Sequence, residues 1–377
     1  MRNLLPLERR AAVLALVLAT LVHGLMLMRA GGDTFVFAAL GQEDTLTTPH
    51  IMDVIEDETL LARTSLGHDG RFFLVQSWDP FYLTLDHYEH LDRPVYRGQR
   101  MLFPAIIGLG GLAPVGSVPV LLALTNILAV ALGTLGTAKL CTRFGKNPMF
   151  GLAFVFNVGI LSEISIGGAG IVAFALAVWG ALALEDHRIG RAATLFMLSA
   201  LTREVMLLFV AGASLLHMVR RRRLPILLAA PSLVGMVGWG MYLRLRLESG
   251  SGIDEVREIG LPLVGAAEAA VQWPDDGVGT VLFMALVLLS LPWLILRSVV
   301  DRNALTWGSV GFVALAAVLT VFVWRQPFDI TRGIIPVFTA LAVSAAPRWV
   351  DPDASAADPD TSHPLDKRLE NALASAE

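Results

Sequence analysis

The chain has 377 residues and a formal net charge of -4, and 55% of its residues are hydrophobic while 16% are charged. Its mean hydropathy is positive and apolar runs of about 20 residues recur, which excludes a soluble domain because water-facing helices need regular charged faces. No basic face suited to nucleic acid is present, so nucleic acid is excluded as a partner. A backbone in lipid must satisfy its hydrogen bonds internally, so the composition predicts an all-α, polytopic transmembrane helical bundle.

The first apolar run, 11–29, follows Arg2, Arg9 and Arg10 and precedes no small-residue cleavage pattern, so we expect a retained membrane anchor. With the N-terminus in the cytoplasm, the positive-inside rule gives about 10 spans and a cytoplasmic C-terminus. In chain order, the apolar runs are 11–29, 101–115, 117–140, 148–166, 169–185, 192–202, 205–219, 224–243, 279–297, 305–324 and 333–347.

The run at 101–115 is not counted as a span, because it is short and is interrupted by Pro104, Gly108 and Pro114. We expect an interfacial helix, or a segment that dips into the membrane and returns. Leaving it out places every basic cluster in the cytoplasm. These clusters are Arg143/Lys146, Arg188/Arg191, Arg220 to Arg223, Arg297/Arg302 and Arg348.

Basic residues flank both ends of the stretch 191–220, which is too long for one ordinary span. It forms either a helical hairpin, with Thr202, Arg203 and Glu204 at the outer tip, or one tilted helix that buries the Arg203–Glu204 pair. The hairpin is favoured because it keeps these charges out of hydrocarbon.

One transmembrane domain, 1–347, is predicted, followed by a mobile cytoplasmic tail, 348–377, rich in Asp, Ala, Ser and Pro. Within the domain, 30–116 forms a large first extracytoplasmic loop that includes the interfacial helix, and 245–278 forms a smaller one. Residues 30–100 contain twelve Asp or Glu, five Arg and no Lys. A loop this long exceeds what a connection needs, so we look for function there.

Three motifs in the first loop mix carboxylates, guanidinium groups and aromatic rings, which suits a site at the lipid boundary. They are His68-Asp69-Gly70-Arg71-Phe72-Phe73, Trp78-Asp79-Pro80-Phe81-Tyr82, and Arg93-Pro94-Val95-Tyr96-Arg97-Gly98-Gln99-Arg100.

These motifs resemble elements of bacterial, mannosyltransferase-like members of the GT-C glycosyltransferase superfamily. Such enzymes have an Asp-Gly-aromatic element in the first outer loop and a later Tyr-Arg-x-Gln-Arg-x-Leu-x-Pro element, here Tyr96 to Pro104. Leu201-Thr202-Arg203-Glu204 is similar to their Thr-Arg-Glu element, and Thr331-Arg332-Gly333-Ile334-Ile335-Pro336 to the Arg-x-x-x-Pro element that opens their last span. The resemblance covers residues 1 to about 347 in the order of its motifs. It departs from the pattern at His68 and Arg71, where relatives have Tyr and Gln.

The resemblance implies a transferase that moves a sugar, hexose or pentose, from a polyprenyl-phosphate donor to a lipid, glycan or protein acceptor. The reaction inverts the anomeric centre at the extracytoplasmic face of the plasma membrane. It needs a carboxylate to accept the proton of the attacking hydroxyl and cations to stabilise the departing phosphate. Asp69 is the first candidate base, with Gly70 permitting a backbone turn. Asp33, just after the first span, is the alternative.

Arginine binds phosphate oxygens in bidentate fashion and stays charged near lipid, although a snorkelling arginine at a membrane boundary has the same sequence pattern. The candidate phosphate ligands are Arg97, Arg100, Arg203 and Arg332, and the candidate substrate-binding residues are His68, Arg71, Tyr96, Glu163 and Glu204.

No metal site is predicted, because the ligand-type residues between Asp86 and His90 have no framework of further ligands; a divalent metal cofactor stays open, as the superfamily includes both kinds of enzyme. The lone Cys141 excludes an internal disulfide and suits a small apolar residue at a helix end. Two other functions are weighed. A non-catalytic scaffold of cell-envelope glycopolymer assembly would keep the fold without chemistry. A transporter would place charges near mid-membrane, and these spans keep them at their ends.

Overall fold

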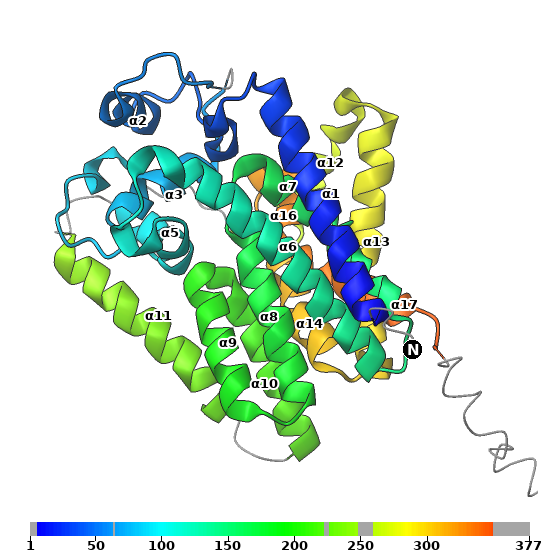
Figure 1. Ribbon diagram of the computed structural model, residues 1–377. Coiled ribbons are helices and arrows are strands. Elements are labelled where there is room, and N and C mark those ends of the chain that lie inside the picture. Colours follow the sequence, from blue (N-terminus) through cyan, green and yellow to red (C-terminus); the bar gives the residue numbers. More distant parts are fainter. Residues whose placement is uncertain (1–5, 63–64, 222–225, 248–258, 350–377) are drawn as a thin grey trace, which may run out of the picture.

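The computed structural model describes residues 6–62, 65–221, 226–247 and 259–349, and over these ranges the regular structure is helical, with two isolated β-bridges (Figure 1). The predicted all-α class is therefore confirmed for the described part of the chain. Of the predicted cytoplasmic tail, 348–377, all but residues 348 and 349 lie outside the described residues.

Within the described residues, four helices are long and apolar enough to cross a membrane, and a bent pair of helices makes a fifth if the pair is one span. At 1.5 Å per residue, the 23 residues of the first reach about 34 Å, which exceeds a bilayer core of roughly 30 Å. The four are α1 (Leu7–Arg29), α6 (Val118–Arg143), α11 (Ile226–Arg246) and α13 (Val278–Val300). The pair is α16 (Pro327–Gly333) and α17 (Ile335–Ala345), bent by 72°.

Several predicted spans are shorter or broken as helices, so the count of about ten remains a prediction. The run 148–166 divides into a 3-10 helix, η5 (Pro148–Ala153), and α7 (Val158–Ile166), because the Asn157 side chain accepts from the Gly159 N–H and begins a new helix. The shorter apolar helices are α8 (Gly170–Glu185), α9 (Ile189–Thr202) and α14 (Ala304–Val318).

The stretch 191–220 forms the predicted two-helix arrangement and not one tilted helix. Arg203 is extended (φ -155°, ψ 117°) and separates α9 from η6 (Glu204–Met206) and α10 (Leu207–Arg221). At the far ends, Nη1 of Arg220 lies 2.9 Å from a carboxylate oxygen of Glu185, which precedes α9. The two helices therefore return to the same end of the bundle, with Arg203 and Glu204 at their tip.

Helix α6 ends beside the start of α1 (Figure 1), where the Thr142 hydroxyl donates to Glu8. Described members of the basic clusters assigned to the cytoplasm make contacts at this end. Lys146 donates to the carbonyls of Val343 and Ser344, and Arg297 also donates to Ser344. These contacts tie the end of α6 to the ends of α13 and α17. Which side of a membrane this end faces remains a prediction.

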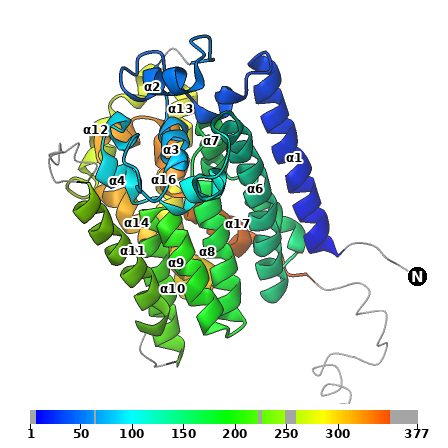
Figure 2. The same ribbon diagram turned by 60° about the vertical axis from the view of Figure 1, so that its left-hand side comes forward.

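The segment predicted to form the first extracytoplasmic loop lies at the opposite end, where short helices pack over the bundle (Figure 2). They are η1 (Thr34–Ala38), α2 (Thr47–Ile55), α3 (Asp69–Trp78), η2 (Tyr88–His90), α4 (Pro94–Gly98) and α5 (Leu102–Ile107). The run 101–115 is not one helix, because η3 (Leu109–Gly111) contains Gly110 at φ 72° and η4 (Val115–Ser117) leads into α6. Farther along the chain, α12 (Val264–Ala270), η7 (Trp273–Asp276) and α15 (Val321–Trp324) complete the elements.

Glycines let the interior helices approach closely, and Gly212 of α10 is the clearest case. A Cβ at this position would lie 2.1 Å from the Trp307 carbonyl oxygen of α14. We predict that Gly212→Ala destabilises the protein by about 1–3 kcal/mol, because one of two packed helices must shift. Thermal unfolding in lipid nanodiscs measures this loss. Gly238→Ala is the matched control, since nothing lies within 4 Å of its Cβ position, and equal melting temperatures for the two variants would contradict the prediction.

Candidate functional site

Asp69 is the first residue of α3, and the glycine behind it fixes where this helix packs. A Cβ on Gly70 would lie 2.7 Å from the carbonyl oxygens of both Ala38 and Ile166, so glycine lets α3 approach η1 and the end of α7. Gly70 is helical and has no positive φ, so its predicted role in a turn is wrong. Its role is close contact, which seats Asp69 over the bundle.

Three guanidinium groups from different parts of the chain converge on the Asp69 carboxylate. Nη1 of Arg97 in α4 donates to Oδ1 at 2.9 Å, and Nη1 of Arg332 in α16 donates to Oδ2 at 3.0 Å. Nη1 of Arg100 lies 3.7 Å from Oδ2, which is an ion pair without a hydrogen bond. The structure thus brings together one candidate base and three candidate phosphate ligands.

Each of these arginines also has a carboxylate partner of its own. Arg97 donates to both oxygens of Asp92, at 2.9 and 3.0 Å. Arg100 donates to both oxygens of Glu204, at 2.9 and 2.8 Å. Such bidentate pairs fix the plane of a guanidinium as well as its position. Nε of Arg332 lies 3.2 Å from Oδ1 of Asp329.

The fourth candidate phosphate ligand, Arg203, contacts Glu163 and the backbone of Arg332 and lies farther from Asp69 than the other three arginines. Its Nη1 donates to Oε1 of Glu163 at 2.8 Å and to the Arg332 carbonyl at 3.2 Å. Glu163 also accepts the Gly170 N–H at 2.8 Å. The Nε atom of Arg203 is buried and makes no hydrogen bond within the described residues. Arg203 therefore supports Arg332 from behind and adds positive charge to the site.

The electrostatics of the cluster keep Asp69 ionised at neutral pH. Burial raises the pKa of Asp69 by disfavouring its charged form, but four neighbouring guanidinium groups outweigh burial and hold the pKa well below its usual range. In decreasing order of effect, they belong to Arg332, Arg97, Arg100 and Arg203. The Asp69 side chain keeps 17% of its surface exposed, so it is not sealed inside the protein.

Two residues of the cluster, Asp92 and Asp329, were not predicted from the sequence. Asp329 stands three residues before Arg332 on one helical turn, which is a recognisable ion-pair spacing. Asp92 stands five residues before Arg97, across the start of α4, and no local pattern indicates that pair. Acidic residues are common in a predicted outer segment, so neither carboxylate stands out in the sequence.

The predicted substrate-binding residues divide into two groups. Tyr96 and Glu204 join the cluster through Arg100, whose Nη2 donates to the Tyr96 hydroxyl at 2.8 Å. Arg71 instead points to Asp44, with Nε 2.9 Å from Oδ2, and it donates to the His68 carbonyl.

Arg71 still reaches the cluster indirectly, through the aromatic ring that follows it. The guanidinium carbons of Arg71 and Arg97 lie 4.3 and 3.9 Å from the centre of the Phe72 ring. The His68 ring is 6.1 Å from that of Phe328. Arg71 therefore borders the cluster through the Phe72 ring, and His68 packs against the residue that precedes Asp329.

Asp33, the alternative base, has a structural role at the start of η1. Its Oδ1 accepts the Phe35 N–H at 2.8 Å and its Oδ2 accepts the Leu61 N–H at 2.6 Å. Within the described part of the chain, no ion pair joins Asp33 to an arginine. Its contacts are those of a capping residue that also anchors the segment near residue 61.

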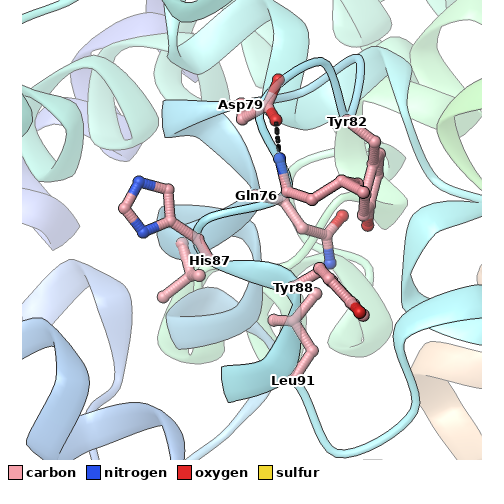
Figure 3. A pocket seen from close by; sticks show the side chains of 8 residues that line it. Gln76, Asp79, Tyr82, His87, Tyr88 and Leu91 are labelled. Atoms are coloured by element: carbon pink, nitrogen blue, oxygen red, sulfur yellow. Dashed lines mark hydrogen bonds between the residues drawn. The ribbon is translucent and has the colours of Figure 1, made fainter. Parts of the chain in front are cut away.

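The cavity beside α3 is too small to be a sugar site. Its volume is about 10 Å³, which is room for about one water molecule. Figure 3 shows His87 on one side of it and Tyr82 on the other, with Asp79, Gln76, Tyr88 and Leu91 around it. In the described structure, the Asp69 cluster is the stronger candidate for a site.

A group of three histidines links α2 to the chain that precedes α4. The rings of His50 and His90 stack with centres 3.6 Å apart and planes inclined by 7°, while His50 Nε2 lies 3.1 Å from His87 Nδ1. The Thr47 hydroxyl donates to the His90 carbonyl at 2.7 Å. Nitrogens of parallel stacked rings do not converge, and among the described residues no group of three His, Cys, Asp or Glu side chains is arranged to hold a metal ion.

We predict that acid weakens this link. Burial, with the nearby rings of His90 and His87, lowers the pKa of His50 to about 4, although Asp53 opposes the shift. An unfolded histidine titrates near 6.5, so the unfolded state binds more protons between about pH 6.5 and 4, and stability falls as pH drops through that window. Chemical unfolding of the wild type and His50→Phe at several pH values measures the loss. The variant should lose less, and equal losses would refute the assignment.

No protein-family model matches the chain, and neither the curated proteins nor the solved structures include a match. The resemblance to GT-C glycosyltransferases thus remains an expectation from sequence motifs.

Proposed function

We propose that the protein is a GT-C-type, inverting glycosyltransferase that uses a polyprenyl-phosphate sugar at the extracytoplasmic face of the plasma membrane. The observation that supports it best is the convergence of Arg97, Arg100 and Arg332 on Asp69 at one end of an apolar helical bundle. A partly exposed carboxylate beside several guanidinium groups offers both groups that the reaction needs.

In the proposed reaction, an acceptor hydroxyl attacks the anomeric carbon of the donor sugar. The new carbon–oxygen bond forms on the face opposite the phosphate, and the bond between the anomeric carbon and the phosphate oxygen breaks. Asp69 accepts the hydroxyl proton, and the polyprenyl phosphate leaves with the bonding electron pair. Arg97, Arg100 and Arg332 stabilise the negative charge that grows on the phosphate.

The neighbouring residues have positioning roles in this proposal. Glu204 and Tyr96 hold Arg100, and Glu163 holds Arg203 behind Arg332. His68 and the Arg71 region border the acceptor side, where the sequence departs from the GT-C pattern. Membrane lipids surround the bundle, which we propose to have about ten spans with both termini cytoplasmic. The acceptor is a lipid, glycan or protein.

A non-catalytic scaffold for cell-envelope glycopolymer assembly is the second candidate. The observation that favours it is that every arginine of the cluster already has a carboxylate partner, as in a purely structural ion-pair network. A structural network has no need of an exposed centre, however, and Asp69 and Arg332 keep 17% and 23% of their side-chain surface exposed.

The deciding experiment supplies purified protein in lipid nanodiscs with a panel of polyprenyl-phosphate hexoses and pentoses, together with total envelope lipid and glycan as acceptors. We expect release of polyprenyl phosphate coupled to a new glycosylated product with an inverted anomeric configuration. Assays with and without EDTA test the divalent metal. Failure of every donor would reject the transferase and leave the scaffold.

A further inference from the structure

The Asp69 cluster contains one more carboxylate than its arginines require. Arg97, Arg100, Arg203 and Arg332 each pair with a carboxylate that contacts no other guanidinium of this set among the described ion pairs. These partners are Asp92, Glu204, Glu163 and Asp329, respectively. Asp69 is different, because it is shared by three of the arginines. Asp69 is thus the central anion among arginines that other carboxylates already hold in position.

The arginines of the cluster differ in exposure. The side chains of Arg97 and Arg100 are 10% and 8% exposed, whereas those of Asp69 and Arg332 are 17% and 23% exposed. The open side of the cluster is thus the side on which Asp69 meets Arg332. An anion that enters there meets Arg332 and Asp69, while Arg97 and Arg100 lie deeper. The holding carboxylates Asp92 and Asp329 are 40% and 29% exposed and stand at the edge of the cluster.

We infer that Asp69 is a built-in substitute for the ligand, and that the phosphate group of a lipid-linked ligand takes its place between Arg97, Arg100 and Arg332. The identity of the phosphate as that of a polyprenyl phosphate rests on the proposed function. The exchange itself rests on the arrangement of the cluster.

The exchange needs little rearrangement of the protein, because only the Asp69 side chain has to turn. The bidentate contacts of Asp92 and Glu204 keep Arg97 and Arg100 oriented while Asp69 moves away. The phosphodiester of a donor offers two non-bridging oxygens and one negative charge, as the carboxylate does. The polyprenyl phosphate left after transfer offers three such oxygens, so it satisfies more guanidinium donors at once. The ligand therefore replaces the lost carboxylate contacts with charge-assisted contacts of the same kind.

The exchange also explains how such a weakly basic carboxylate becomes a base. While Asp69 faces its arginines, its proton affinity is too low to take a hydroxyl proton readily. Once a phosphate engages those arginines, the positive charge near Asp69 is neutralised and its proton affinity rises. Donor binding would thus precede and enable activation of the acceptor.

Binding, measured without any sugar transfer, tests the inference. Full-length protein in nanodiscs is titrated with polyprenyl phosphate that has no sugar, and in a separate arm with inorganic phosphate. We expect Asp69→Asn to bind polyprenyl phosphate at least tenfold more tightly than the wild type, because the resident competitor is gone. A gain with the lipid but not with inorganic phosphate assigns the site to a lipid headgroup, and a gain with both assigns it to phosphate in general.

Asp92→Asn is the matched variant, since it also removes one negative charge beside Arg97. Asp92, however, only orients Arg97, whereas Asp69 is proposed to compete with the phosphate. We expect it to bind polyprenyl phosphate no better than the wild type. Equal tightening in both variants would mean that net charge alone is responsible and would overturn the inference. So would unchanged or weaker binding in Asp69→Asn.

The melting temperature of each variant, with and without polyprenyl phosphate, keeps the test decisive if Asp69→Asn is unstable. Under the inference, the phosphate raises the melting temperature of Asp69→Asn more than that of the wild type. An equal or smaller rise counts against it. Tighter binding in Asp69→Asn, without transfer from any donor in the wild type, would reject the proposed function and support the exchange. Transfer in the wild type without tighter binding in Asp69→Asn would support the proposed function and reject the exchange.

Discussion

Asp69→Asn should lower sugar transfer by about 10²- to 10⁴-fold, the range expected when a general base is removed. Asparagine has nearly the same shape but cannot accept the hydroxyl proton at neutral pH. Because Asp69 also anchors Arg97 and Arg332 through different oxygens, the variant loses one of these two hydrogen bonds and weakens the other, since the amide has one acceptor oxygen and no charge. The assay is single-turnover transfer in nanodiscs at saturating donor, so that altered donor affinity does not mask the loss in rate.

Asp33→Asn serves as the comparison in the same assay. Its side-chain oxygen still accepts one backbone N–H, so the start of η1 is weakened and the Asp69 cluster is left in place. We expect transfer within a few-fold of the wild type. Loss of transfer in Asp33→Asn with retention in Asp69→Asn would move the base to Asp33.

The sequence was sufficient to predict which residues gather at the polar end of the molecule. It was not sufficient to predict which charged residues pair there. Composition and apolar runs indicated helices, and the charge bias placed Arg143, Arg220 and Arg297 together, as they are at one end of the bundle. These predictions depend on local chemistry that recurs along the chain. The choice of ion-pair partners does not depend on local chemistry. Asp69 and Arg332 are 263 positions apart, and only tertiary packing brings them into contact.

Glycine positions show the same limit. The Asp69-Gly70 dipeptide is typical of a turn, yet Gly70 is needed because the carbonyls of Ala38 and Ile166 leave no room for a Cβ. A sequence cannot distinguish a glycine needed for its φ angle from one needed for close approach. Similarly, Arg71 was expected near the substrate, but it pairs with Asp44, which caps α2 through Thr48.

Helix lengths were harder to predict than helix positions. An apolar run shows where a segment is buried in lipid or in protein, and it does not show where capping residues interrupt it. Asn157 caps the start of α7 and so divides the run 148–166, and Ile334 separates α16 from α17. These breaks place Glu163 and Arg332 at helix ends near Asp69, so the irregularities that shorten the spans also build the site.

Glu163→Ala should destabilise the protein by about 3–5 kcal/mol, because it leaves the Arg203 guanidinium buried without its partner. The Glu163 side chain is 3% exposed and that of Arg203 is 11% exposed, so little water can replace the lost carboxylate. The Gly170 N–H loses its acceptor as well. Unfolding of the purified protein in mild denaturant or by heat measures the loss.

Two variants separate the cost of an unpaired charge from the cost of a smaller side chain. The ion pair of Arg143 and Asp186 at the other end of the bundle is 51% and 40% exposed, so Asp186→Ala should cost under about 1 kcal/mol. Arg203→Met combined with Glu163→Ala should be less harmful than Glu163→Ala alone, since no buried charge is then left unpaired. If Glu163→Ala costs no more than Asp186→Ala, the Arg203–Glu163 pair is not what holds the tip of α9 against α7. In that case Arg203 would be free to turn toward a phosphate, and it would become a direct ligand in place of a support for Arg332.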